Sequence, residues 1–185
     1  MTRCAADVAP IRAEPHDEAE QVTQALRGEP LRAGERRGGW VSVVTAYDYP
    51  GWIRADALEA GEGELLADAS GSPVDVARSY LGTRYLWGGM TERGIDCSGL
   101  VHMAYRRLGR LVPRDADQQE EAGLPVTEPR HGDLVTYGED EADHIAFWVG
   151  DGRILHSTGR DDGIGVVEEE EPASLRARRR KLVRL

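Results

Sequence analysis

Cys97 is the residue whose setting points most directly to chemistry. It lies in the stretch Gly94–Leu100, GIDCSGL, between an aspartate and a serine and just before an apolar helical run. The reactive form of cysteine is the thiolate, and a free thiol has a pKa of about 8.5, so a nucleophilic cysteine needs its anion stabilised. A helix N-terminus supplies unpaired N–H groups and the positive end of the helix dipole. The alternative is a buried cysteine that only fills space at a helix start.

A cysteine nucleophile also needs a base, and the five histidines of the chain differ in their settings. His16 lies in a polar segment, His131 in a turn that we expect to be solvated, and His102 about 140° around the helix from Cys97 at ~3.6 residues per turn. The two others, His144 and His156, lie in neighbouring predicted strands. A nucleophile, a base and a residue that orients the base therefore form the hypothesis for Cys97, His144 and His156. These three lack the paired spacing of a zinc site, and no metal or organic cofactor is implied.

The elements that must position these residues are helices followed by strands. Ser72 as N-cap, Pro73 at the first helical position and Asp75 in the first turn predict a helix that stops near Gly82. A second helix is expected from about residue 97 to 108. The short runs at 132–138, 143–150, 152–159 and 163–168 are rich in β-formers and bounded by turns. This order predicts an α+β domain over residues 72–185, with helices packed on an antiparallel sheet.

The first part of the chain has strand and turn character instead. The runs GGWVSVVTA at 38–46 and YDYPGWIRADAL at 47–58 contain Trp40 and Trp52 around tight turns, which indicates a small β-barrel over residues 1–58 with the two tryptophans in its core. The acidic segment EAGEGELLADASG at 59–71 is expected to be a linker.

Charge and hydropathy exclude several classes of partner. The 185 residues carry a net charge of −10, which argues against nucleic acid, because phosphate binding needs a basic surface. The acidic run 168–171 and the basic run 176–181 are expected to be solvated segments. No stretch approaches the ~20 apolar residues of a membrane span, and no apolar signal-peptide region is visible, so we expect a cytoplasmic protein without membrane contact.

Five motifs of the second half occur in a familiar order: YLWGG, DCSGLV, GDLV, DHIAFWVG and LHSTG. In this the chain resembles the NlpC-type cell-wall cysteine peptidases, which have a papain-like α+β catalytic domain. The resemblance implies that Cys97 is the nucleophile, that His144 is the general base and that His156 is the polar residue that orients His144.

The first half resembles a bacterial Src-homology-3-like barrel, through VTQALRGEPL, GGWVSVVTA and YPGWI. Relatives with this pairing look like enzymes of cell-wall recycling, in which the barrel closes one end of the cleft. They cut free murein peptides after L-alanyl-γ-D-glutamate and before diaminopimelate or lysine. By resemblance, the substrate-binding residues expected here are Tyr85, Trp87, Asp96 and Ser98, together with Glu14 and Tyr49 from the barrel, which would reach the free amine. Tyr85 could also donate to the oxyanion.

Three alternatives stay open for the function. One is a peptidoglycan endopeptidase that acts on intact wall, with the barrel as a wall-binding module. Another is a catalytically inactive scaffold that binds wall peptides. The third is an acyltransferase or amidase, which would share the three residues without needing the barrel. We expect a monomer whose only partner is the murein peptide substrate.

Overall fold

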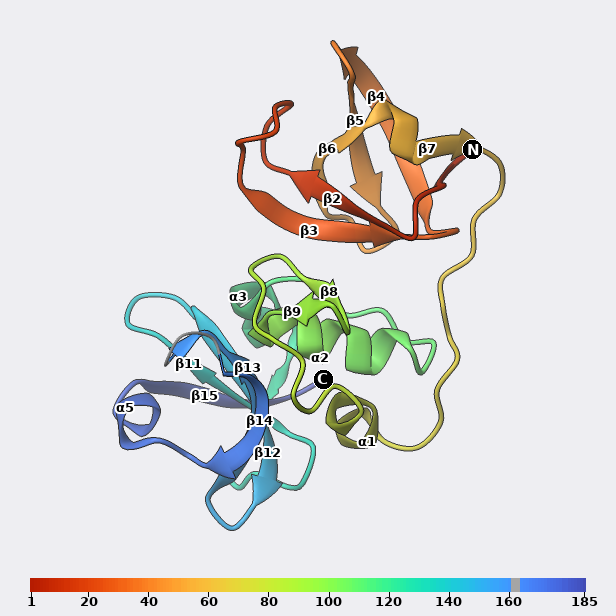
Figure 1. Cartoon of the computed structure of the whole chain (residues 1–185). Helices are drawn as coiled ribbons and strands as arrows, with labels where there is room; N and C mark the ends of the chain where they lie inside the picture. Colours follow the sequence, from red (N-terminus) through yellow and green to blue (C-terminus); the bar gives the residue numbers. More distant parts are fainter. Residues whose placement is uncertain (161–163) are drawn as a thin grey trace. The chain divides into compact units, whose positions relative to one another are not determined.

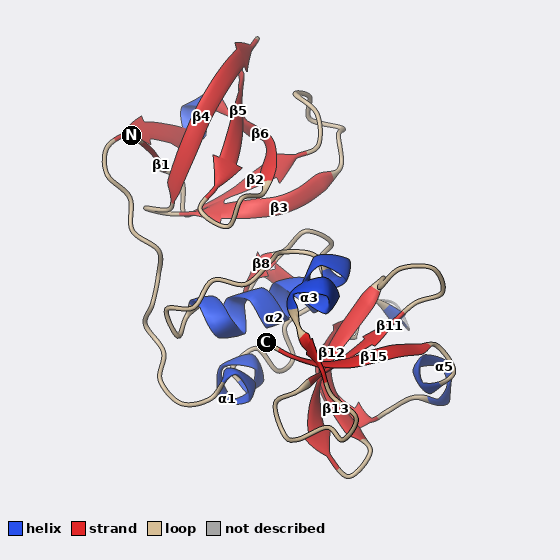
Figure 2. Cartoon of the chain, turned by 180° about the vertical axis from the view of Figure 1, so that it is seen from behind, coloured by secondary structure: helices blue, strands red, loops and turns tan. Residues whose placement is uncertain are grey.

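The computed structural model describes residues 1–160 and 164–185. The chain divides into two compact units, Met1–Leu66 and Ala67–Leu185, and the division falls within the segment 59–71. Each unit is described by itself (Figures 1 and 2). No helix in the described part of the chain is both long enough and apolar enough to cross a membrane.

The first unit is a curled antiparallel sheet of seven strands in the order β3-β2-β6-β5-β4-β1-β7. Its elements are β1 (Thr2–Cys4), β2 (Val8–Arg12), β3 (Gln21–Leu26), β4 (Pro30–Arg37), β5 (Trp40–Thr45), β6 (Pro50–Arg54), the 3-10 helix η1 (Ala55–Ala57) and β7 (Leu58–Ala60). β7 pairs with β1, and the Glu64 N–H donates to the Gly28 carbonyl, so the ordered barrel extends beyond the predicted boundary at residue 58.

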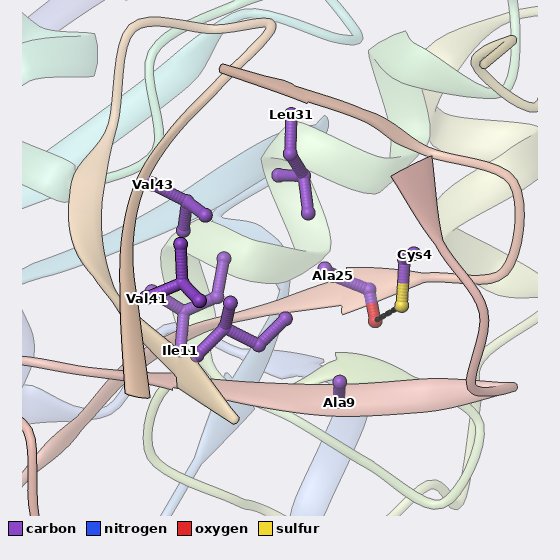
Figure 3. Packing of buried hydrophobic residues seen from close by; sticks show 8 residues of the cluster. Cys4, Ala9, Ile11, Ala25, Leu31, Val41 and Val43 are labelled. Carbon is purple, nitrogen blue, oxygen red and sulfur yellow. Dashed lines mark hydrogen bonds between the residues drawn. The ribbon is translucent and has the colours of Figure 1, made fainter. Parts of the chain in front are cut away.

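Small aliphatic side chains fill the inside of this sheet. Figure 3 shows Ile11, Val41 and Val43 converging from β2 and β5, with Cys4 and Ala25 beside them. Cys4 is a free thiol within this core. Trp40 is buried, whereas Trp52 is only half-buried, so the expectation of a core position holds for Trp40 alone.

The second unit holds helices against a six-stranded sheet in the order β10-β15-β11-β12-β13-β14. Its elements are α1 (Pro73–Arg78), β8 (Met90–Thr91), β9 (Gly94–Ile95), α2 (Cys97–Arg106), α3 (Ala116–Ala122), β10 (Leu124–Pro125), β11 (Leu134–Tyr137), β12 (His144–Gly150), β13 (Arg153–Thr158), β14 (Gly165–Glu170), α5 (Ala173–Arg176) and β15 (Arg179–Arg184). The expected α+β arrangement is confirmed. The predicted strand 163–168 is observed as β14, except that Gly163 lies outside the described residues.

Helices cover the sheet unequally. Figure 2 shows α1, α2 and α3 on one side of the sheet and α5 on the other. The ring of Tyr105 on α2 stacks on Phe147 of β12, with centroids 6.4 Å apart. Leu175 of α5 packs on the opposite face of the sheet, beside Val135 and Ala146. The strand β12 is therefore held from both faces, which fixes the position of the residue at its start, His144.

The predicted start of the first helix is confirmed in atomic detail. The Ser72 hydroxyl accepts from the Asp75 N–H, and the Asp75 carboxylate accepts from the Ser72 N–H, so the two residues form a capping box ahead of Pro73.

The expectation that the charged runs near the end of the chain are solvated is confirmed only in part. Glu170, Arg176, Arg179 and Lys181 are exposed, but the two runs are also built into the sheet and its ion pairs. Residues 179–184 form β15, which pairs with β11 inside the sheet, and Leu182 packs in its apolar face. Glu171 is buried and forms ion pairs with Arg176 and Arg179. Basic side chains on a strand can pair with carboxylates of neighbouring elements, as Arg179 does with Glu171 and Arg180 with Glu120, so a charged run can still form a strand between two others.

Candidate functional site

Cys97 is the first residue of α2, and Asp96 is its N-cap. The Asp96 carboxylate accepts from the Gly99 N–H at 2.6 Å and from the Gly88 N–H at 2.7 Å. These bonds tie the start of the helix to the glycine-rich loop before β8, and aspartate is a favoured N-cap because its oxygen satisfies such N–H groups. The thiol of Cys97 is thereby placed at the N-terminus of α2, where it is 6% exposed.

A buried arginine holds both neighbours of the thiol. Arg114 is 1% exposed and donates to the two carboxylate oxygens of Asp96 at 3.0 and 2.8 Å. It also donates to the Ser98 hydroxyl at 2.9 Å and to the Gly89 carbonyl at 3.3 Å. Asp96 and Ser98 thus have an internal partner that helps to fix the position of Cys97, and their contact with substrate stays a prediction. Arg114 was not anticipated, because its partners lie 16 and 18 residues away in the sequence.

His144 and His156 are in direct contact. Nε2 of His144 lies 2.7 Å from Nδ1 of His156, and the two rings meet edge to face at 77°. His144 begins β12, and His156 lies within the adjacent β13. The N–H of Ile145, the residue after His144, donates to the sulfur of Cys97. The start of β12 therefore meets the N-terminus of α2, and Nδ1 is the ring nitrogen of His144 that His156 leaves open.

Burial favours the neutral forms of Cys97 and His144. Burial, with a smaller effect from Asp96, raises the pKa of the Cys97 thiol to about 12, although the N–H groups of Ile145 and Ser98 oppose this. Burial also lowers the pKa of His144 to about 3, and His156, Arg178 and Arg160 add to the effect. The substrate-free site at neutral pH therefore holds a thiol and a neutral imidazole.

Tyr85 lies near the thiol. It forms an isolated bridge with Ile95, and its ring packs so closely on Gly159 that a Cβ there would lie 3.2 Å from it. Burial, followed by the effect of the neighbouring Cys97, raises the pKa of the Tyr85 hydroxyl. The hydroxyl accordingly stays protonated at neutral pH and can donate a hydrogen bond. Trp87 lies two residues further on and is 58% exposed.

Glu14 and Tyr49 belong to the other unit, Met1–Leu66. The Glu14 carboxylate is 73% exposed and lies 3.3 Å from the His16 ring. Tyr49 is half-buried, and its ring is tilted against that of Tyr47 at 6.4 Å between centroids. Their contact with the amine of a substrate stays a prediction.

Two other histidines, His102 and His131, lie in the second unit. His102 is fully buried on α2 and donates from Nδ1 to the Val112 carbonyl at 2.8 Å. His131 is exposed, as expected. Within residues 1–160 and 164–185, no three His, Cys, Asp or Glu side chains form a group that could hold a metal ion.

Two residues that could not be predicted from the sequence are linked to the histidine pair through His156. Glu169 on β14 contacts the far nitrogen of His156, and Arg160 in turn contacts Glu169. Glu169 lies inside the run of four glutamates at 168–171, where no local signal separates it from its neighbours.

Comparison with known protein families matches both units. Residues 82–179 match the NlpC/P60 family, and residues 11–58 match the domain described as "Bacterial dipeptidyl-peptidase Sh3 domain".

Individual relatives agree with these matches. The chain is 31% identical over 134 residues to a protein of Bacillus subtilis named gamma-D-glutamyl-L-lysine dipeptidyl-peptidase, covering 69% of this chain and 44% of that protein. It is 26% identical over 129 residues to a protein of the same name from Bacillus cereus, covering 65% and 39%. Peptidoglycan endopeptidase RipB of Mycobacterium tuberculosis is 35% identical over 98 residues, which is 45% of this chain and 41% of that protein. The chain thus spans about two fifths of the length of these relatives.

Solved structures show the same fold. An NlpC/P60 family protein from Bacillus cereus superposes with a TM-score of 0.56 at 20% identity, covering 99% of this chain and 62% of that one. The peptidoglycan hydrolase RipB superposes with a TM-score of 0.53 at 28% identity, covering 60% and 62%.

Proposed function

Because this chain belongs to the NlpC/P60 family, we propose that it is a cysteine peptidase in which Cys97 is the nucleophile, His144 the general base and His156 the residue that orients His144. The observation that carries the proposal is the 2.7 Å contact between His144 and His156 at the strand end that meets the thiol-bearing helix start. The arrangement of nucleophile, base and orienting residue is the one that acyl transfer requires.

The mechanism proceeds from a neutral pair. As Cys97 attacks the substrate carbonyl, its proton moves to Nδ1 of His144, which His156 leaves open. The oxyanion that forms is stabilised by backbone N–H groups at the start of α2 and by the Tyr85 hydroxyl. The His144 imidazolium then protonates the leaving amine. Water, activated by the same imidazole, hydrolyses the acyl-enzyme and restores the thiol.

The proposed substrate is a free murein peptide, cut between γ-D-glutamate and the following diamino acid. Support comes from the names of the two Bacillus relatives and from the barrel match to a dipeptidyl-peptidase domain. A dipeptidyl-peptidase must read the free amine of the first residue, and a buried amine needs acceptors. Glu14 and Tyr49 are the acceptors that we propose, which would place the reaction in cell-wall recycling.

The test is digestion of L-Ala-γ-D-Glu-diaminopimelate and L-Ala-γ-D-Glu-L-Lys, each beside its N-acetylated form, followed by mass spectrometry. Wild type is expected to release the dipeptide from the free-amine peptides only, and Cys97→Ala is expected to release none while keeping its circular dichroism spectrum. Turnover by Cys97→Ala would remove the nucleophile assignment. Equal cleavage of the acetylated peptides would remove the amine-reading role of Glu14 and Tyr49.

A second candidate is an endopeptidase that cuts intact peptidoglycan. The observation in its favour is the identity of 35% to RipB over 98 residues, higher than the identity to either Bacillus relative. Incubation with purified sacculi separates the two functions. Release of soluble wall peptides by wild type but not by Cys97→Ala would favour the wall endopeptidase, and the absence of release beside cleavage of free tripeptide would favour the recycling enzyme.

A further inference from the structure

His156, the second histidine of the hydrogen-bonded pair, also contacts a carboxylate. Nε2 of His156 lies 2.9 Å from Oε1 of Glu169 on the neighbouring strand β14. Arg160 donates from one nitrogen to both oxygens of that carboxylate, at 2.6 and 2.7 Å. The His156 side chain is fully buried, and the Glu169 side chain is 24% exposed, so water competes little for these contacts.

The carboxylate gives the series of bonds a direction. An ionised carboxylate can only accept, so Nε2 of His156 must carry a proton and donate it. A neutral His156 then has an unprotonated Nδ1, which accepts from Nε2 of His144. Nδ1 of His144 is left as an acceptor, and this is the nitrogen that must receive the thiol proton. Each tautomer thus follows from the one before it, starting at Glu169.

Glu169 is suited to this role because it is ionised. Burial raises the pKa of its carboxyl, but the hydrogen bonds from Arg160 and His156 outweigh burial and hold the pKa below its usual range. Burial lowers the pKa of His156, and the bond to Glu169 opposes that shift. Arg160 therefore keeps Glu169 a weak base, which leaves the proton on His156.

We propose that Glu169, held by Arg160, is a positioning residue that fixes the tautomers of His144 and His156 and stabilises the imidazolium formed on His144 during catalysis. Its effect on turnover rests on the proposed peptidase function, whereas its effect on the tautomers does not. The proton balance is unchanged from the mechanism above: one proton passes from the thiol to His144 Nδ1 and on to the leaving amine, and Glu169 neither gains nor loses a proton.

Other charged or titratable groups near the histidine pair are unchanged in Glu169→Gln. They are the Cys97 thiol, which accepts from the Ile145 N–H next to His144, Tyr137 on β11 with the Glu171 carboxylate bonded to its hydroxyl, Asp143 with its partner Arg178, and Arg160, which a separate variant replaces below. Only Glu169 places a carboxylate oxygen in hydrogen-bond contact with a ring nitrogen of the pair among the described residues.

The first experiment observes the tautomers directly, by long-range proton–nitrogen NMR correlation of ring nitrogens in the full-length protein at neutral pH. Wild type is expected to show Nε2–H tautomers for both His144 and His156. Glu169→Gln is expected to give mixed tautomers, because an amide can donate as well as accept. An Nδ1–H tautomer of His156 in wild type would overturn the proposal. This result does not depend on the substrate.

The second experiment measures kcat and KM across pH on the tripeptide that wild type cleaves. Glu169→Gln is expected to lower kcat by about 10- to 100-fold with KM within about twofold, as for residues that orient a catalytic group. It should also move the acid limb of kcat/KM to lower pH, and Arg160→Gln should move it to higher pH, by about one unit each. A general loss of structure would not shift the two variants in opposite directions.

Glu168→Gln is the matched control, because it removes the same charge one position earlier on β14. Glu168 faces the other side of the sheet and pairs with Arg78 at 2.8 Å. Its kcat should stay within about twofold of wild type. Equal kcat for Glu169→Gln and wild type would overturn the kinetic part of the proposal. Absence of cleavage by wild type would instead defeat the proposed function, and the NMR result would still decide the tautomers.

Discussion

Arg114→Met tests the structural basis of the nucleophile's position. The substitution keeps most of the aliphatic volume but removes a guanidinium that is 1% exposed and makes four hydrogen bonds around Cys97. Asp96 keeps its two backbone N–H donors but loses its cation in a site where its side chain is only 7% exposed. Breaking a buried ion pair from one side costs about 3–5 kcal/mol, because the remaining charge is uncompensated.

This loss of stability affects the unit formed by residues 67–185, so the stability of that unit must be measured separately from that of the barrel. We would follow hydrogen–deuterium exchange of peptides from each unit of the full-length protein against urea. Peptides of α2 should lose about 3–5 kcal/mol of protection, and peptides of the barrel should be unchanged within about 0.5 kcal/mol.

The double variant Asp96→Asn/Arg114→Met is the control, since it removes both charges. Its loss of unfolding free energy should be smaller, by about 1–3 kcal/mol, than the sum of the losses in the two single variants. A cost below about 1 kcal/mol for Arg114→Met alone would refute the reasoning, because it would place the pair among solvated surface ion pairs.

Three further predictions concern other buried groups. Burial lowers the pKa of His102 to about 3, below the unfolded value of 6.5, so its contribution is complete above pH 6.5 and is lost as pH falls toward 3. The unfolding free energy of wild type should therefore decrease between pH 7 and pH 5. In His102→Asn this decrease should be smaller by about 2 kcal/mol. Glu171→Gln should cost about 1–3 kcal/mol in thermal unfolding, because Tyr137, Arg176 and Arg179 bond to that buried carboxylate, whereas exposed Glu170→Gln should cost under about 0.5. Iodoacetamide labelling of Cys97, mapped by mass spectrometry, should still accelerate above pH 9, and a rate that levels off near pH 7 would contradict the neutral thiol.

Local signals in the sequence were sufficient for α1, α2 and the strands β11 to β14, but not for α3, β10, α5 or β15. A capping box joins the N-cap residue to the residue three positions later, so Ser72 and Asp75, with Pro73 between them, could be interpreted without the fold. Apolar runs bounded by turns likewise indicated β11 to β14. His144 and His156 followed from the same runs, because each lies within or at the start of a strand whose limits were predicted.

The four consecutive glutamates 168–171 show what could not be predicted. Glu168 pairs with Arg78, Glu169 bonds to His156, Glu170 is exposed and Glu171 is buried against Arg179. Alternation along a strand separates one face from the other, but the partners depend on register and on which strand lies alongside. Those partners lie 8 to 90 residues away, so identical letters acquire different roles only in the folded chain.

The raised pKa of the Cys97 thiol determines when His144 must accept its proton. A helix N-terminus stabilises an anion by typically 0.3–1 kcal/mol, which is less than one pKa unit. Burial, with a smaller effect from Asp96, shifts the Cys97 pKa in the opposite direction, to about 12, which is more than one pKa unit above the value of a free thiol. Burial therefore outweighs the helix, and the thiolate must form together with the imidazolium as substrate is attacked. A positive charge on buried His144 is itself unfavourable, so a nearby negative group is needed to stabilise it. Glu169 supplies that charge, because it is hydrogen-bonded to Nε2 of His156.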